Sequence, residues 1–166
     1  MLVDDAARFE FNGAALTVIN NHLSSRFGST PVFGAIQPFF QAAETEREAQ
    51  TGALNDYVDH LLSQDGEARV VVLGDFNTFE FTDDLTEILP GKGKKILFNL
   101  LEGVRDDNRY SYIFEGNSQV LDHIFVTRNM TAQTELDIVH VNVDFPRVDE
   151  SVASDHEPLV TRLRLD

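Results

Sequence analysis

The apolar and polar positions of this chain predict short strands interrupted by one long helix. Residues 15–22 are rich in β-branched side chains and end in polar ones, which favours a strand that follows a turn at Gly13. Residues 70–73, Val-Val-Val-Leu, form a continuous apolar run typical of a strand buried on both faces. From about residue 41 to residue 64, apolar residues recur at helical spacing. The residues on that helical face are Ala53, Leu54, Tyr57, Val58, Leu61 and Leu62.

The second half of the chain shows one short helical segment followed by a series of strands. Residues 82–89 predict the helix, with two aspartates in its first turn, where the helix dipole favours anions. β-Branched and aromatic residues predict strands at 110–114, 120–127, 136–143 and 157–165, separated by turns and loops. We therefore expect an α/β (α+β) fold, in which one mostly antiparallel, mixed sheet carries its helices on one face.

Composition and charge narrow the class of protein. The chain has 166 residues, of which 42% are hydrophobic and 25% charged, so a folded domain with a core is expected rather than disorder. The formal net charge of −15 argues against binding nucleic acid by neutralising its phosphates. An acidic enzyme can still act on phosphates where metal ions supply positive charge. The absence of cysteine excludes disulfides and thiolate metal sites.

Four short motifs place polar groups at the ends of apolar runs. They are N-N-H-L at 20–23, G-D-F-N at 74–77, L-D-H-I at 121–124 and S-D-H-E-P at 154–158. This combination of acids, an amide and imidazoles suits a site that holds a divalent metal, orients a water and stabilises the transition state of a phosphoester. The candidate residues are His22, Asp75, Asn77, Asp122, Asp155 and His156.

Each motif taken alone also has a structural interpretation. Asp75 and Asn77 share a face if the chain is extended there, but an Asp/Asn turn after a strand gives the same sequence. Asp155 offers a carboxylate to a hard metal and His156 offers an imidazole to a phosphoryl oxygen, although a capped turn also explains them. His22 at a strand end is either a site residue or a structural histidine.

Asp122 lies within an apolar stretch, where an ionised carboxylate needs a partner. An imidazole N–H is a suitable donor, which predicts the pair Asp122–His156. The alternative is that Asp122 faces solvent, because His123 lies on the opposite face of the strand and only one face need be buried. Tyr110, Ser111 and Tyr112 either line a cleft or, as is common for aromatic residues in strands, contribute to the core.

With these motifs in place, the chain resembles the C-terminal part of the endonuclease/exonuclease/phosphatase superfamily, which has the deoxyribonuclease-I-like fold. The matching segments are 18–23, 73–77, 110–112 with 121–124, and 154–158, and the resemblance covers about residues 15–165. Within the superfamily, the chain is most similar to bacterial extracellular nuclease-like proteins. That similarity alone suggests an extracellular or periplasmic location.

The resemblance implies a role for each motif. Asp75 would orient the attacking water, and Asn77 would hold that water or a phosphate oxygen. His156, paired to Asp122, would bind the scissile phosphate, and His22 would contact phosphate or act as an acid. The resemblance further implies a metal contact and two substrate-binding residues, which are Asp155, Asn21 and Tyr112. The implied cofactor is Mg²⁺, or Mn²⁺ or Ca²⁺ in its place.

Complete members of the superfamily also have an N-terminal half, which contributes an Asn and the main metal ligand, a Glu. No residue before position 15 matches these two, so we expect residues 1–166 to be the C-terminal portion of a single domain, inactive in isolation. A missing half would expose an apolar face that binds that half or a second copy. The candidates to line this face are Val18, Val71, Leu73, Ile124 and Val126.

The sequence thus predicts a metal-dependent phosphoester hydrolase, foremost a phosphodiesterase or nuclease. Two alternatives remain open at this point. The same motifs would serve a phosphatase that acts on phosphorylated lipids or sugars, because the reacting phosphoryl group is alike. The absence of the N-terminal metal ligand would instead suit an inactive fragment that acts as an interaction module.

Overall fold

A five-stranded mixed sheet forms the centre of the structure. The computed structural model describes residues 6–144 and 153–165. The strand order is β1-β2-β3-β7-β4; β2 and β3 run parallel, whereas the other neighbours run antiparallel. The predicted mixed, mostly antiparallel sheet is therefore confirmed. Its strands are β1 (Ala6–Phe11), β2 (Ala14–His22), β3 (Val70–Asp75), β4 (Leu97–Asn99) and β7 (Asp122–Thr127).

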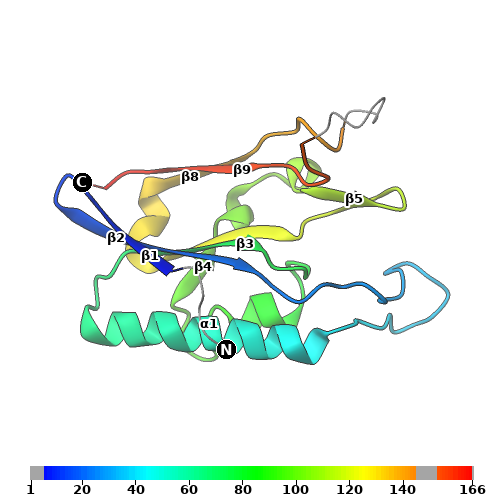
Figure 1. Ribbon diagram of the computed structural model, residues 1–166, viewed down its shortest axis with the longest axis horizontal. Coiled ribbons are helices and arrows are strands. Elements are labelled where there is room, and N and C mark those ends of the chain that lie inside the picture. Colours follow the sequence, from blue (N-terminus) through cyan, green and yellow to red (C-terminus); the bar gives the residue numbers. More distant parts are fainter. Residues whose placement is uncertain (1–5, 145–152, 166) are drawn as a thin grey trace.

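Helix α1 (Glu44–Gln64) covers one face of this sheet (Figure 1). Two parallel neighbouring strands need a crossover connection, and α1 provides it between β2 and β3. Leu54 and Val58 of α1 are buried against Val70, Val72 and other apolar residues of the sheet. The helix predicted at 82–89 is a short π-helix, η1 (Asp84–Ile88), which contributes Leu85 to the same core.

The opposite face of the sheet is covered by a second, two-stranded sheet, in which β8 (Thr134–Ile138) pairs with β9 (Leu159–Leu163) (Figure 1). This layer corrects the prediction of an exposed apolar face. Of the five candidates, Val71, Ile124 and Val126 are buried, and Val18 and Leu73 are half-buried. They pack with Leu136 of β8 and with Leu159 and Leu163 of β9.

The hairpin of β1 and β2 was only half predicted. Asn12 and Gly13 form its tight turn with φ values of 52° and 79°, a backbone conformation that Asn and Gly tolerate. The sequence pattern predicts the turn at Gly13 but no strand before it. All six residues of β1 are exposed, including Phe9 and Phe11. Because neither face of β1 is buried, its sequence need not alternate between apolar and polar residues, and the strand gives no periodic signal.

Two predicted strands differ from the structure at their ends. The strand expected at 120–127 begins only at Asp122. Residues 117–119, just before it, form a separate strand. That strand, β6 (Asn117–Gln119), makes a hairpin with β5 (Tyr112–Phe114). The strand expected at 136–143 ends at Ile138, and the strand expected at 157–165 begins at Leu159. The 3₁₀ turns of the chain are η2 (Leu100–Gly103), η3 (Asp106–Asn108) and η4 (Arg128–Gln133).

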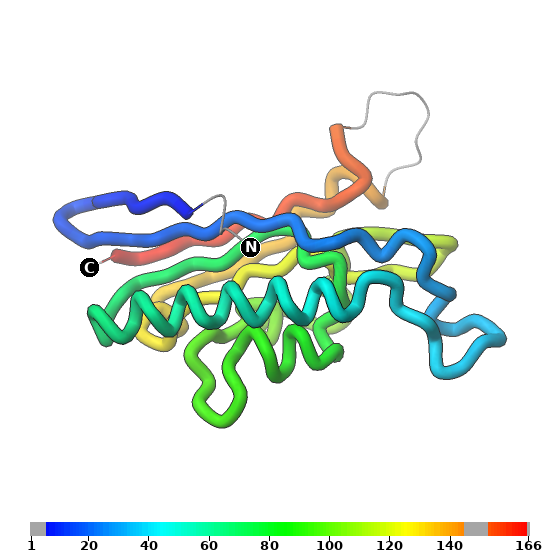
Figure 2. Tube along the Cα trace, turned by 60° about the horizontal axis from the view of Figure 1, so that its bottom comes forward, coloured from blue at the N-terminus to red at the C-terminus, as the bar shows by residue number. Residues whose placement is uncertain are grey.

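The long loop between β2 and α1 and the β5–β6 hairpin extend past the same end of the central sheet (Figure 2). This is the end at which the parallel strands β2 and β3 finish and the antiparallel strand β7 begins. Within the described residues, no helix is both long enough and apolar enough to cross a bilayer. The polar motifs therefore gather at one edge of a well-packed sheet.

Candidate active site

Three of the motifs meet because of strand register. His22 at the end of β2 is the register partner of Asp75 at the end of β3. Asp75 is in turn opposite Asp122, the first residue of β7. Directly paired residues of neighbouring strands point to the same face of a sheet. His22, Asp75 and Asp122 therefore form a row of polar side chains across three strands.

The predicted pair of Asp122 and His156 is present. His156 Nδ1 lies 2.6 Å from Asp122 Oδ2, and the Ser111 hydroxyl donates to the same oxygen at 2.7 Å. The hydrogen bond to Asp122 raises the pKa of the His156 imidazole, more than partial burial lowers it. Because Nδ1 is engaged, Nε2 is the ring nitrogen left for a ligand. Asp122 thus holds His156 in one orientation and favours its charged form.

His123, the neighbour of Asp122, has a purely structural place. Its side chain is fully buried, with the ring centroid 5.6 Å from that of Phe76, and burial lowers its pKa to about 4. The strand therefore buries His123 and leaves Asp122 at the site, so the alternative of a solvent-facing Asp122 without a partner is wrong. Phe76, between Asp75 and Asn77, is buried in the same core.

The second half of the site is built around Asp75. Its Oδ1 accepts the backbone N–H of Asn77 at 2.8 Å, and its Oδ2 lies 3.4 Å from His22 Nε2. Burial raises the pKa of the Asp75 carboxyl, against the opposing effect of the Asn77 N–H. Asn77 adopts φ 51°, and its Nδ2 donates to the Leu23 carbonyl at 3.0 Å. Asn77 therefore fixes the turn that presents Asp75, and its Oδ1 is the atom with capacity for a ligand.

Gly74 of the G-D-F-N motif is required by the close approach of β2. A Cβ built at Gly74 would overlap the Asn21 carbonyl, and the φ of +132° is one that other residues rarely adopt. We expect Gly74→Ala to displace β3 from β2 and to lower the free energy of unfolding by about 2 kcal/mol or more. Urea unfolding checks this, with Gly103→Ala as the control, because a Cβ at Gly103 meets no atom within 4 Å. Equal stability of the two variants would contradict the packing argument.

A cleft of about 480 Å³ opens over these groups. Its polar residues include His22, Asp75, Asn77 and His156. Tyr112 also lines it and lies with its ring centroid 4.8 Å from that of His156, joined by an isolated β-bridge between the two residues. Tyr112 therefore lies in the cleft, and its predicted substrate contact stays a prediction.

Asn21 and Asp155 lie differently from the rest. Asn21 points away from the His22 face, donates to the Leu73 carbonyl at 2.6 Å and does not line the cleft, which corrects its predicted substrate contact. Its amide ties β2 to β3 instead. Asp155 is exposed beside His156 and does not line the cleft either, although its charge contributes to raising the His156 pKa. Its predicted metal contact stays a prediction.

Arg26 is a polar residue of the site that none of the motifs predicts. It lies in the loop after β2 and lines the cleft with its guanidinium 4.1 Å from the ring centroid of Phe79, and burial lowers its pKa to about 10. Ser111, predicted as a possible cleft residue together with Tyr110 and Tyr112, orients Asp122. The available signal for Arg26 is its position four residues after His22, which indicates a site only once the fold brings it near Asp75.

Comparison with known proteins assigns the family. The sequence profile described as "Endonuclease/Exonuclease/phosphatase family" matches residues 6–148. The chain belongs to this family. No curated protein matches its sequence. The resemblance seen in the four motifs is therefore confirmed at the level of the family, and the fold neighbours below agree with it.

Several solved structures share the fold at low sequence identity. A truncated TDP2 from Caenorhabditis elegans is 15% identical, with a TM-score of 0.65 over 94% of this chain and 56% of that one. A Bacteroides vulgatus endonuclease/exonuclease/phosphatase is 19% identical, with a TM-score of 0.62 over 97% of this chain and 54% of that one. A mannosyl-6-phosphatase of Bacteroides thetaiotaomicron is 18% identical, with a TM-score of 0.58 over 92% of this chain and 52% of that one. The chain spans about half the length of these proteins.

The residues near the cleft offer part of a donor set for a divalent metal. The Asp75 carboxylate accepts the backbone N–H of Asn77 and the Asp122 carboxylate is bonded to His156, so both are held in place, while the exposed Asp155 lies beside His156. Mg²⁺ sites commonly use one or two carboxylates plus substrate phosphate, so Asp155 fits one part of such a site. In the described parts of the chain, the one compact group of three potential ligands lies elsewhere, at His140, Asp144 and Glu157.

Proposed function

We propose that this chain carries the phosphate-binding half of a phosphodiesterase site, in a protein that hydrolyses nucleic acid or a related phosphodiester. The observation that carries the proposal is the pair of His156 and Asp122 beside Asp75 and His22 at one cleft. Membership of the endonuclease/exonuclease/phosphatase family supports phosphoester hydrolysis in general. The choice of a diester is our own inference from the aromatic residues that line the cleft.

The residues divide into two chemical roles. Asp75, when ionised, accepts a proton from a water that attacks phosphorus, and Asn77 holds the turn that aims this carboxylate. His156, when protonated on Nε2, donates to a phosphoryl oxygen as charge develops there. His22 and Arg26 add further donors on the other wall of the cleft. Negative charge on the phosphate is thus met by three cationic or potentially cationic groups.

Aromatic side chains favour a substrate with a flat or apolar group next to the phosphate. Phe27, Phe79 and Phe114 line the cleft together with Tyr112. Phe27 is 95% exposed, so its ring is free to stack on a ligand. Base–aromatic stacking contributes roughly 1–3 kcal/mol for each base in single-stranded nucleic acid. The net charge of −15 argues against long duplexes, so a short or single-stranded diester is the substrate that we propose.

Two components would come from outside the described cleft. Mg²⁺, or Mn²⁺ or Ca²⁺, would be held by Asp155 together with substrate oxygens, and would supply charge neutralisation and Lewis acidity when bound. The N-terminal half implied by the resemblance is the partner that we propose for this chain, because the known folds are about twice as long. That half would provide the additional metal ligand.

The proposal is tested by comparing substrates in the protein that includes the N-terminal half. We expect cleavage of a single-stranded oligonucleotide and of bis-p-nitrophenyl phosphate, and at most trace activity from the 166-residue chain alone. Phe27→Ala should raise KM for the oligonucleotide, with Phe9→Ala, on the exposed strand β1, as the control. Selective hydrolysis of sugar or lipid monophosphates would indicate a phosphatase instead. No hydrolysis of any phosphoester would indicate an interaction module.

Two titrating groups predict a bell-shaped pH dependence of kcat/KM. Asp75 must be ionised, so the rate should rise with pH through its pKa, which burial places above the ordinary 3.8. His156 must be protonated, so the rate should fall as pH rises through its pKa, which Asp122 places above the ordinary 6.5. Asp122→Asn removes the anion, so the alkaline limb should move to lower pH. It should slow the reaction less than loss of His156, because Asp122 orients and does not react.

The control for this pH profile is Asp137→Asn, an exposed aspartate of β8. Rate profiles of the wild type and the two variants, measured from pH 4 to pH 9, provide the comparison. An alkaline limb that stays in place in Asp122→Asn would show that His156 is not the group that must be protonated.

A further inference from the structure

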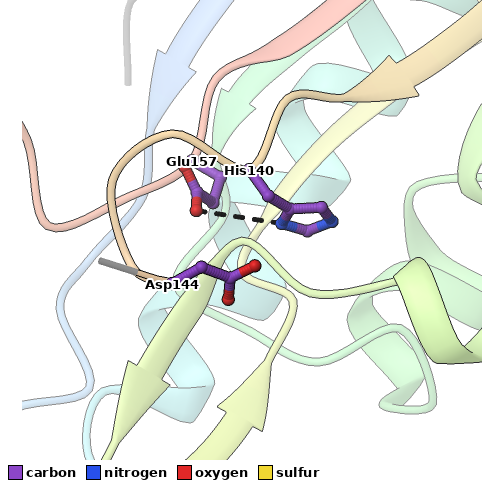
Figure 3. Close-up of side chains that lie close together, drawn as sticks. All are labelled: His140, Asp144 and Glu157. Carbon is purple, nitrogen blue, oxygen red and sulfur yellow. Dashed lines mark ion pairs between the residues drawn. The ribbon is translucent and has the colours of Figure 1, made fainter. Parts of the chain in front are cut away.

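A second polar cluster lies beside His156, just before the last strand begins. His140 follows β8, Asp144 lies four residues later, and Glu157 comes directly after His156 (Figure 3). One potential ligand atom from each side chain lies within 4.8 Å of the others. The three residues come from two segments of chain that are held together here before β9 begins.

Glu157 is rigidly oriented. Its side chain is buried, and its carboxylate accepts three successive backbone N–H groups: Val141 at 2.9 Å and Asn142 at 2.8 Å on Oε2, and Val143 at 2.9 Å on Oε1. Oε1 accepts only one of the three bonds, so it retains a lone pair for another partner.

That lone pair faces another potential acceptor. His140 Nε2 lies 2.9 Å from Asn108 Oδ1, an acceptor, which places a proton on Nε2 and makes Nδ1 the nitrogen that can offer a lone pair to a ligand. Nδ1 is buried and has no hydrogen-bond partner among the described residues. It lies 3.8 Å from Glu157 Oε1, which is too long for a hydrogen bond (Figure 3). A cation between the two atoms would satisfy both.

Neighbouring groups hold the other ligands in place. The Tyr110 ring stacks on the His140 imidazole with centroids 4.2 Å apart. The Tyr110 hydroxyl is 2.8 Å from each oxygen of the Asp144 carboxylate, and it fixes that carboxylate beside the imidazole. The N–H donated by His140 to Asn108 is the type of outer contact that orients metal-bound histidines.

We propose that His140, Asp144 and Glu157 bind a divalent transition-metal ion, Zn²⁺ or Mn²⁺, at a structural site separate from the catalytic cleft. One imidazole nitrogen with two carboxylates suits such ions, whereas Mg²⁺ and Ca²⁺ prefer oxygen ligands alone. The ion would offset two carboxylates in a chain of net charge −15. It would also fix the backbone at His156, because Asn142 Nδ2 in the same loop donates to the His156 carbonyl at 2.6 Å.

The test is metal binding by the 166-residue chain, which needs no catalytic activity. Calorimetric titration with Zn²⁺ should give one site per chain, with weaker or no heat from Mg²⁺. Asp144→Asn and His140→Gln should each weaken Zn²⁺ binding by at least about tenfold, the scale for perturbing a metal site. Asp144 is exposed, so its substitution should leave folding intact, which circular dichroism checks. The matched control is Asp155→Asn, because Asp155 is the acid expected at the cleft; it should retain binding.

A second measurement identifies the nitrogen. In ¹⁵N NMR of the histidine rings, Zn²⁺ should shift His140 Nδ1 while Nε2 stays protonated. Absence of Zn²⁺ binding by the wild-type chain would overturn the proposal. Loss of binding in Asp155→Asn with retention in His140→Gln would also overturn it, since the ion would then lie at the cleft. A proton on Nδ1 that Zn²⁺ does not displace would show that His140 simply bonds to Glu157.

Discussion

His156→Ala is expected to lower kcat for phosphodiester cleavage by roughly 10²-fold or more, the scale of losing one electrostatic or acid–base group. The reason is its position: the imidazole is held by Asp122 at 2.6 Å, and its pKa is raised by that bond. Substrate should still bind, because Arg26 and the aromatic residues of the cleft remain. Steady-state kinetics of the protein that includes the N-terminal half provide the measurement.

The control for this substitution is His60→Ala, an exposed histidine on α1. Both variants remove one imidazole, so the comparison isolates the effect of the position of His156 in the cleft. A rate near that of the wild type for His156→Ala would remove the proposed mechanism, because no other residue described here makes the same contact with the phosphate.

Asp75→Asn is expected to have an effect of similar size, roughly 10²-fold or more on kcat. Asparagine keeps the shape of the side chain but cannot accept a proton from water. An asparagine Oδ1 still accepts the Asn77 N–H and keeps the turn, whereas the pairing of His22 with Oδ2 depends on the carboxylate. Single-turnover rates separate this loss from slow product release. The exposed Asp56→Asn on α1 is the control, and an equal rate in the two variants would contradict the role of Asp75.

The four motifs identified side chains that lie together in the structure, whereas the pattern of apolar residues gave only part of the fold around them. His22, Asp75, Asp122 and His156 could be recognised because each is a polar residue at the end of a strand, and strand register then determines that they meet. The pairing of Asp122 with His156 followed from the cost of an isolated carboxylate in an apolar stretch. These inferences use local chemistry, which the sequence contains.

What the sequence could not predict depends on contacts between distant segments. The composition of 136–143 and 157–165 indicates strands but not the sheet to which they belong, so the sequence does not reveal that β8 and β9 cover the apolar residues of the central sheet. Asn21 shows the same limit at a smaller scale. Its place in a motif beside His22 suggested a ligand contact, whereas strand pleating turns it toward Leu73.

If the cleft between His156 and Asp75 binds the scissile phosphodiester, a diester ligand must contact the two cleft histidines. Histidine NMR of the 166-residue chain during titration with a non-hydrolysable phosphorothioate dinucleotide measures this contact. We expect the ring signals of His22 and His156 to shift together and saturate, while those of His60 do not move. In Asp122→Asn, the His156 response should weaken. A titration that shifts other signals and leaves both cleft histidines unchanged would show that the phosphodiester does not bind there.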